Sequence, residues 1–367
     1  MKILEVVTAL ESGGAERFVV DMCNQMAQDG HDVVLLCIQD PNVGERGFYL
    51  KDVSPEVKFV TLGAKSLGVG TFFAMLKAVK RIGADVVHIN SMPATAMAFI
   101  AMLLYRKSKF VVTCHNQAQF ERSYGWKFQL KKLAYSLRLF EHVAISHENE
   151  KSIYDVYGIK ASKLIYNGRA AMQTTDKIDD VRREVEGFKA TEHTLIFTIV
   201  ARCMEQKNIP RLVRCFNEVK RRGADIALIV IGERYDGEIG QKAMADAMPH
   251  IHFLGVRHNV ADYLSMTDFF TLSSDFEGMP VSLIEAMAFG CIPVATPVSG
   301  VKDVIENGVT GFIAENFSDE EYISAIERAI EHRADVDRNL LMSKYIDNFT
   351  MKNCSRKYEQ FFADLIK

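Results

Sequence analysis

Short runs of aliphatic and β-branched residues recur along the whole chain, and a longer stretch with helical periodicity separates each run from the next. Continuous apolar strands joined by helical crossovers are typical of parallel sheets that helices cover on both faces. Ligands of such α/β folds bind beyond the carboxyl ends of the strands. The pattern predicts strands in the first half at Ile3–Val7, Val33–Ile38, Val57–Leu62, Asp85–Ile89, Phe110–Cys114 and His142–Ser146. It predicts strands in the second half at Leu195–Ala201, Ile226–Gly232, Ile251–Leu254, Phe269–Leu272 and Pro293–Thr296.

The chain has 367 residues, enough for two domains, and one stretch interrupts the alternation of strands and helices. Residues 170–194 are polar, charged and only weakly periodic, which is typical of a segment between domains. We therefore expect a first domain over residues 1–169, a linker over 170–194 and a second domain over 195–349.

Composition excludes several classes of protein. Apolar residues make up 48% of the chain and charged residues 25%, as in globular enzymes. The chain opens on the strand-like MKILEVV rather than a secretory signal. Its longest apolar stretch, residues 94–105, is too short to cross a bilayer and is expected to be a buried helix. Seven cysteines without a C-x-x-C pair argue against a disulfide framework and a zinc site, so we expect a cytoplasmic protein.

One part of the first half is strongly basic. Residues 65–138 contain twelve Lys and Arg against two acidic residues, with Phe120, Tyr124 and Trp126 interleaved. Such a stretch is suited to an anionic membrane surface, here the inner face, or to a phosphorylated acceptor. A solvated basic face is the alternative. No nucleic-acid motif is present, so nucleic acid is not an expected partner.

Two carboxylates, Glu277 and Glu285, stand eight positions apart around a predicted helix start. Gly278–Pro280 lies between them, and the helical run stops at Gly290; proline suits the first helical turn and glycine the end. The N–H groups of Val281–Leu283 should point out of this helix start, where the helix dipole favours a phosphate. A carboxylate on each side of an anion site suits a nucleotide-sugar, which has hydroxyl groups on both sides of a diphosphate.

This segment resembles the donor-binding signature of retaining glycosyltransferase family 4, E-G-x-P-x-x-x-x-E-A-M-A-x-G followed by a P-V-A-T strand and glycine turns. The bare glutamate pair alone would equally suit an ordinary strand–loop–helix with two solvated side chains. The resemblance covers nearly the whole chain. It implies the GT-B fold, with two Rossmann-like α/β domains facing across a cleft and a C-terminal helix, residues 350–367, packing back on the first. The matching residues are Glu277, Gly278, Pro280, Glu285, Ala286, Met287, Ala288, Gly290, Pro293, Val294, Ala295, Thr296, Gly300, Gly308, Gly311 and Phe312.

Two cations follow the first strand of the second half. Arg202 ends that strand and Lys207 comes five residues later, so both are placed to neutralise a diphosphate. The family has Arg and Lys at this spacing, where they stabilise the charge of the leaving group. Gly13 and Gly14 open a helix after the first strand and resemble the family's G-G-A-E loop at the donor diphosphate. Surface charges and a plain strand–helix turn are the alternative interpretations.

Further resemblances are weaker. His115 follows a strand where the family commonly has a histidine that hydrogen-bonds the sugar and helps hold positive charge at the anomeric carbon. His88 is expected to be structural or to line the cleft. Val256 and Arg257 follow F-L-G and resemble the loop whose backbone reads the base, although an ordinary turn is equally compatible. After N-G, Arg169 and Ala170 replace the family's apolar residue and aspartate, which weakens any interpretation of this hinge.

The resemblance implies transfer of a hexose or N-acetylhexosamine, with retention, from a nucleotide-diphosphate sugar, by default UDP-linked, to a glycan or lipid-linked acceptor in polysaccharide, capsule or lipopolysaccharide-type assembly. An epimerase of the same fold and a non-catalytic nucleotide-sugar binder are the alternatives. No metal or other cofactor is expected, and Asp335-Val336-Asp337 lies in a polar helical stretch, where we interpret it as a chance D-x-D. The expected catalytic residues are His115, Arg202, Lys207 and Glu277. The expected donor-binding residues are Gly13, Gly14, Arg202, Lys207, Val256, Arg257, Glu277, Gly278, Met279, Val281, Ser282 and Glu285.

Overall fold

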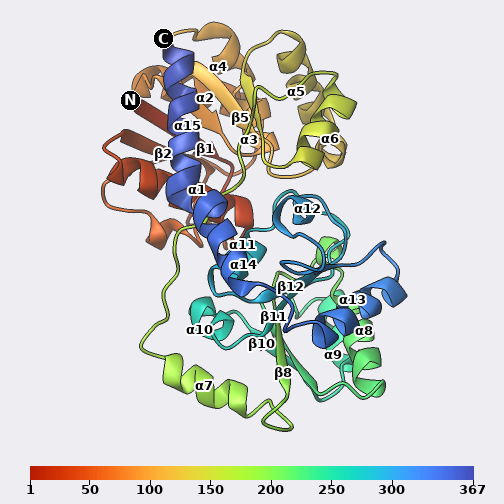
Figure 1. The fold of residues 1–367 in the computed structure, drawn as a ribbon. Coiled ribbons are helices and arrows are strands. Elements are labelled where there is room, and N and C mark those ends of the chain that lie inside the picture. Colours follow the sequence, from red (N-terminus) through yellow and green to blue (C-terminus); the bar gives the residue numbers. More distant parts are fainter. The chain divides into compact units, whose positions relative to one another are not determined.

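The computed structural model describes residues 1–367, which form two compact units. Unit 1 comprises Met1–Ala170 together with Asn348–Lys367, and unit 2 comprises Ala171–Asp347. The chain therefore begins and ends in the same unit, and its C-terminal helix lies against the first helix (Figure 1). No helix combines the length and the apolar character needed to cross a membrane.

Unit 1 contains a seven-stranded parallel sheet in the order β3-β2-β1-β4-β5-β6-β7. Its strands are β1 (Lys2–Val7), β2 (Asp32–Gln39), β3 (Lys58–Ala64), β4 (Val86–Ile89), β5 (Lys109–Thr113), β6 (Glu141–Ala144) and β7 (Lys163–Leu164). Its α-helices are α1 (Gly14–Gln28), α2 (Val69–Ile82), α3 (Met92–Met97), α4 (Phe99–Leu104), α5 (Trp126–Ser136), α6 (His147–Tyr157) and α15 (Met351–Ile366).

The two faces of this sheet are covered by different helices, because side chains alternate along a strand. Ile3 and Val7 of β1 pack with residues of α1 and α15 in one buried cluster. Leu4 and Val6 pack with residues of α2, α3, α4 and α5 in the other. Glu5 occupies a core position of β1 and is fully buried.

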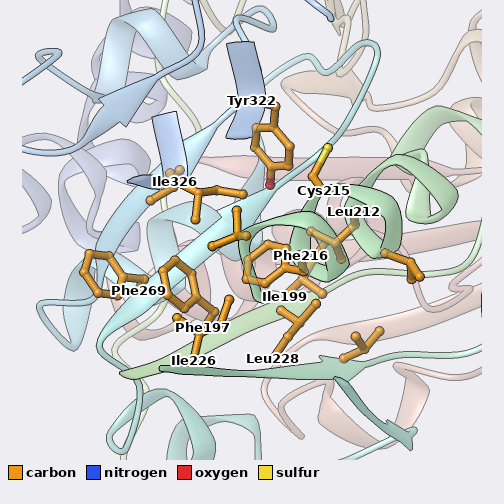
Figure 2. Close-up of a cluster of buried hydrophobic side chains, with 14 of the residues drawn as sticks. Phe197, Ile199, Leu212, Cys215, Phe216, Ile226, Leu228, Phe269, Tyr322 and Ile326 are labelled. Carbon is orange, nitrogen blue, oxygen red and sulfur yellow. The ribbon is translucent and has the colours of Figure 1, made fainter. Parts of the chain in front are cut away.

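Unit 2 contains a six-stranded parallel sheet in the order β10-β9-β8-β11-β12-β13. Phe197 stacks on Phe269 and meets Phe216 edge-on at its core, with Tyr322 beside them (Figure 2). The strands are β8 (Leu195–Val200), β9 (Ile226–Ile231), β10 (Ile251–Gly255), β11 (Phe269–Leu272), β12 (Ile292–Ala295) and β13 (Phe312–Ile313). The α-helices are α7 (Ile178–Glu186), α8 (Ile209–Arg221), α9 (Glu238–Asp246), α10 (Val260–Leu264), α11 (Val281–Ala288), α12 (Val301–Val304), α13 (Asp319–Glu331) and α14 (Arg338–Lys344).

All eleven predicted strands are present, and the predicted α/β class with two parallel sheets is confirmed. Three local expectations need correction. The apolar stretch 94–105 forms parts of two short helices rather than one, and Leu104 is 63% exposed. Asp335 and Asp337 lie in the turn between α13 and α14, where Asp337 caps α14. Residues 170–194, predicted as a linker, include α7, whose Val181 and Val185 are buried in unit 2.

Candidate functional site

The loop between β11 and α11 holds a buried carboxylate. Glu277 is only 5% exposed, and its Oε1 lies 2.5 Å from Lys207 Nζ and accepts a hydrogen bond from Ser274 Oγ at 2.6 Å. Its Oε2 accepts a longer hydrogen bond, 3.3 Å, from Gln206 Nε2. A carboxylate buried this far needs such partners, since burying an unpaired charge is costly. The arrangement leaves Oε2 as the less engaged oxygen.

Two hydrogen bonds fix this pair by joining the loop after β8 to the loop after β11. The Asp275 N–H donates to the Gln206 carbonyl at 2.8 Å, and Ser273 Oγ donates to the Lys207 carbonyl at 2.8 Å. Asn208 adopts a left-handed conformation, φ +44°, and its side chain caps α8. Lys207 and Glu277 were predicted as separate groups for the diphosphate and the sugar. The structure instead shows one ion pair with no net charge.

A close backbone approach holds the other side of the Glu277 loop. Gly300 has φ +76°, and a Cβ at this position would lie 2.4 Å from the Gly278 carbonyl oxygen and 2.9 Å from Met279 Cα. Thr296 Oγ1 donates to the Ser274 carbonyl at 2.6 Å. The S-G turn of the sequence motif therefore supports the segment that carries Glu277.

The start of α11 differs from the prediction by one residue. Pro280 is the N-cap, with ψ 108°, and the helix begins at Val281. The Leu283 N–H donates to the Pro280 carbonyl at 3.1 Å, so it is not available to a ligand. The N–H groups of Val281 and Ser282 have no acceptor within the chain and remain for an anion. Glu285 is half-buried in the second turn of this helix.

Arg202 provides a cation that the chain itself leaves unpaired. It follows β8, is partly buried, and forms no side-chain hydrogen bond or ion pair. Gly232, at the end of β9, comes so close that a Cβ there would lie 1.9 Å from the Ala201 carbonyl oxygen. The backbone before Arg202 is thus tightly fixed. Arg202 and the start of α11 lie at the carboxyl edge of the unit 2 sheet.

In the loop after β10, the Arg257 side chain bonds to other groups of unit 2. Arg257 Nη1 donates to the Leu254 carbonyl at 2.5 Å, and its Nε donates to the Tyr263 hydroxyl at 3.0 Å. The Arg257 guanidinium also lies 3.7 Å from Glu184 of α7. The N–H groups of Val256 and Arg257 have no acceptor within the chain, so the backbone of this loop is what it offers to a ligand.

In unit 1, the glycine loop caps a helix without needing glycine geometry. Gly13 is the N-cap of α1 with φ −121° and ψ 157°, an extended conformation that any residue adopts. Gly14 is exposed, and its N–H and that of Ala15 have no acceptor within the chain. The loop therefore offers N–H groups at the carboxyl edge of the unit 1 sheet.

His115 follows β5 at the same edge of that sheet. Its Nε2 donates to Asn90 Oδ1 at 3.1 Å, its ring lies 5.0 Å from the Phe18 ring, and its Nδ1 is buried without a partner. Burial, and secondarily the neighbouring His88, lowers the pKa of His115 to about 3. The imidazole is therefore neutral near pH 7. His88 itself is fully buried, as expected for a structural histidine.

Two family models match most of the chain. The model described as Glycosyltransferase Family 4 matches residues 12–170, and that described as Glycosyl transferases group 1 matches residues 180–346. The chain belongs to glycosyltransferase family 4.

Individual relatives match different shares of this chain. A glycogen synthase of Pseudomonas putida is 30% identical over 193 residues, 50% of this chain but only 36% of that enzyme. The chain thus spans about a third of the first glycogen synthases it matches. The UDP-Gal:α-D-GlcNAc-diphosphoundecaprenol α-1,3-galactosyltransferase of Escherichia coli is 22% identical and matches 100% of this chain and 97% of its own length. HepE of Anabaena, solved with UDP and glucose, has a TM-score of 0.81 at 18% identity, covers 99% of both chains and shares the fold.

Several residues around the family signature were not predicted from the sequence. Ser274 and Gln206 bind the Glu277 carboxylate, and Asn90 and Glu5 lie behind His115. Glu5 left a signal, because it is a charged residue in the middle of an otherwise apolar strand. Ser274 and Gln206 left none, since short polar residues in loops are ordinary.

Proposed function

We propose that this chain transfers a hexose or N-acetylhexosamine, with retention and without a metal ion, from a UDP-sugar to a lipid-linked glycan acceptor. The observation that carries this proposal is the carboxyl edge of the unit 2 sheet. It combines a paired carboxylate, an unpaired guanidinium and two N–H groups at a helix start. These groups match the hydroxyls and the diphosphate of a nucleotide-sugar.

The diphosphate is bound by the positive end of this site. Arg202 has no partner to give up, and its guanidinium forms two parallel hydrogen bonds with phosphate oxygens readily. The N–H groups of Val281 and Ser282 add donors and the positive end of the α11 dipole. Charge developing on the leaving diphosphate is then met by protein groups, with Lys207 nearby, which supports a metal-independent reaction.

Glu277 binds the sugar rather than attacking it. Its Oε1 is paired with Lys207 and hydrogen-bonded by Ser274, and this engagement lowers the nucleophilicity of the carboxylate. Oε2 retains capacity to accept a hydrogen bond from a sugar hydroxyl. This supports front-face transfer, in which the acceptor oxygen bonds to the anomeric carbon, the bond to the diphosphate breaks, and a phosphate oxygen takes the acceptor proton. Glu285 binds the ribose, and the Val256 and Arg257 backbone reads the base.

A lipid-linked acceptor is supported by the relative from Escherichia coli, whose name gives a diphosphoundecaprenol-linked sugar as its acceptor. It is also supported by one face of unit 1. Helices α2, α4 and α5, which cover the same side of the sheet, expose Val69, Phe73, Leu104 and Trp126 by 73, 59, 63 and 51%. The surrounding stretch 65–138 is strongly basic. Exposed apolar side chains among cations are typical of a surface that binds anionic membranes.

The donor and the reaction are tested together. The purified protein is incubated with UDP- and GDP-sugars, with and without EDTA, and with a prenyl-diphosphate-linked sugar as acceptor. Transfer that is insensitive to EDTA, with an anomeric configuration retained by NMR, is expected. Glu277→Gln should lose transfer but keep nucleotide affinity, whereas Glu205→Gln, an exposed glutamate two residues from Lys207, should behave as wild type.

The alternatives give different results in this assay. An epimerase would convert the sugar-nucleotide without acceptor, and a non-catalytic binder would be stabilised by nucleotide without turnover. Either result would overturn the proposal.

Membrane contact is tested with vesicles of anionic and of neutral lipid at low salt. Leu104→Glu and Trp126→Glu should reduce sedimentation with anionic vesicles. Tyr154→Glu, on α6 outside the basic stretch and 55% exposed, is the matched control and should not. Equal loss in all three variants would contradict this face as the membrane contact.

A further inference from the structure

A fully buried carboxylate lies behind the candidate site of unit 1. Glu5 points from a core position of β1 and is 0% exposed. Its Oε1 accepts from His88 Nδ1 at 2.9 Å, and its Oε2 accepts from Asn90 Nδ2 at 2.7 Å. No lysine or arginine pairs with it. An amide nitrogen only donates, so the hydrogen bond to Glu5 Oε2 fixes which end of the Asn90 amide faces the carboxyl group.

The orientation of the Asn90 amide in turn sets the tautomer of His115. With its amide nitrogen directed at Glu5, Asn90 presents its Oδ1 to His115 Nε2, 3.1 Å away. A carbonyl oxygen only accepts, so His115 must carry its proton on Nε2. His115 Nδ1 is then an unprotonated acceptor, and it is the ring nitrogen that is buried without a partner in the chain.

A second branch of hydrogen bonds also reaches Glu5. His88 Nδ1 lies 2.9 Å from Glu5 Oε1, and His88 Nε2 lies 2.7 Å from Thr113 Oγ1. Thr113 Oγ1 lies 3.0 Å from the Tyr358 hydroxyl of α15, and either hydroxyl can donate. This branch ends on the same carboxylate but does not touch Asn90 or His115.

We propose that Glu5 and Asn90 are positioning residues that hold His115 in its Nε2–H tautomer, so that Nδ1 accepts a hydrogen bond from a substrate hydroxyl. This rests on the proposed function and changes what the histidine contributes to it. A neutral ring with an unprotonated Nδ1 binds a hydroxyl by accepting, and it brings no positive charge to the anomeric carbon. The role suggested by the family resemblance, support of that charge, thus falls to other groups.

The tautomer is measured directly by NMR of protein labelled with ¹⁵N-histidine, with His115 assigned by its loss in His115→Gln. In the wild type we expect a protonated Nε2 and an unprotonated Nδ1. In Glu5→Gln the carboxamide can offer Asn90 either its oxygen or its N–H group, so the Asn90 amide is no longer fixed in one orientation. His115 should therefore show a mixture of the two tautomers. Thr113→Val, which cuts only the other branch, should leave the His115 tautomer unchanged.

Activity separates positioning from general stability. Glu5→Gln should lower kcat by on the order of tenfold, the effect of one misdirected hydrogen bond, with UDP affinity unchanged. If Glu5→Gln does not fold, Asn90→Leu removes the acceptor of His115 Nε2, and a mixture of tautomers with a similar fall in kcat is expected. A His115 that keeps its Nε2 proton in these variants, or kcat that stays at the wild-type value, would overturn the proposal. The NMR result is independent of turnover, so a wild type without transferase activity would count against the proposed function alone.

Discussion

Replacing Gly300 by alanine tests whether the turn after β12 fixes the Glu277 loop. Gly300 has φ +76°, and its Cβ would lie 2.4 Å from the Gly278 carbonyl oxygen. Gly308 is the matched control, because its φ of +79° is nearly the same but a Cβ there would meet nothing within 4 Å. Both variants therefore carry the same left-handed backbone cost, about 1–2 kcal/mol. They differ in the steric clash of the new Cβ, which only Gly300→Ala has.

The size of the clash sets the expected difference. Side-chain Cβ atoms essentially never come closer than 3.0 Å to such an atom, so the turn and the Glu277 loop must separate by about 0.6 Å. Overpacking of this kind costs roughly a further 1–3 kcal/mol. Misplacing a substrate-binding group by about 1 Å costs on the order of 100-fold in rate, so a shift of this size should reduce kcat/KM by roughly tenfold or more.

Thermal unfolding and transfer kinetics measure both effects on the same proteins. Gly308→Ala should lower the free energy of unfolding by about 1–2 kcal/mol and leave kcat/KM at the wild-type value. Gly300→Ala should lower both, and nucleotide affinity should fall with kcat/KM. If the two variants lose the same stability and both keep wild-type kinetics, the Gly300 contact does not position Glu277.

Three further results are expected. Arg202→Met should reduce transfer strongly and change the free energy of unfolding by less than about 0.5 kcal/mol. Lys207→Met should also reduce transfer, and because it leaves the Glu277 carboxylate unpaired it should lower the free energy of unfolding by about 1–3 kcal/mol. Equal stability of the two variants in urea unfolding would contradict this. Burial lowers the pKa of His115 to about 3 and that of His250 to about 4, and it also lowers the pKa of His142. These three imidazoles therefore stay neutral in the folded chain at pH values where they bind protons in the unfolded chain. Stability should therefore be full above about pH 6.5 and fall as the pH drops toward 4, and a flat urea-unfolding profile would refute it. Burial raises the pKa of all seven thiols, none in a disulfide, so a thiol reagent at pH 8 should react only after denaturation.

The sequence was sufficient for the strands because parallel strands buried on both faces are continuous apolar runs. The strands that escaped prediction, β7 and β13, have only two residues each and carry no periodic signal. The placement of Arg202, Lys207 and Glu277 in the loops after β8 and β11 also followed from the pattern.

Contacts between segments that are distant along the chain could not be predicted from the sequence. Lys207 and Glu277 are 70 residues apart, and their pairing depends on hydrogen bonds between two loops. Glu5, Asn90 and His115 meet because β1, β4 and β5 are neighbours in the sheet, an order that strand patterns do not specify. The capture of the Leu283 N–H by Pro280 depends on one backbone angle.

The return of the C-terminus to unit 1 has a consequence for synthesis. Residues Ala171–Asp347 are contiguous and can fold as soon as they leave the ribosome. Unit 1 cannot be completed then, because Tyr358, whose hydroxyl bonds to Thr113, is made 245 residues later. Until then the α15 face of its sheet, with the buried Glu5 and His88, lacks its cover. The domain that is translated first is therefore completed last, and a chain released early exposes a surface prone to aggregation and proteolysis.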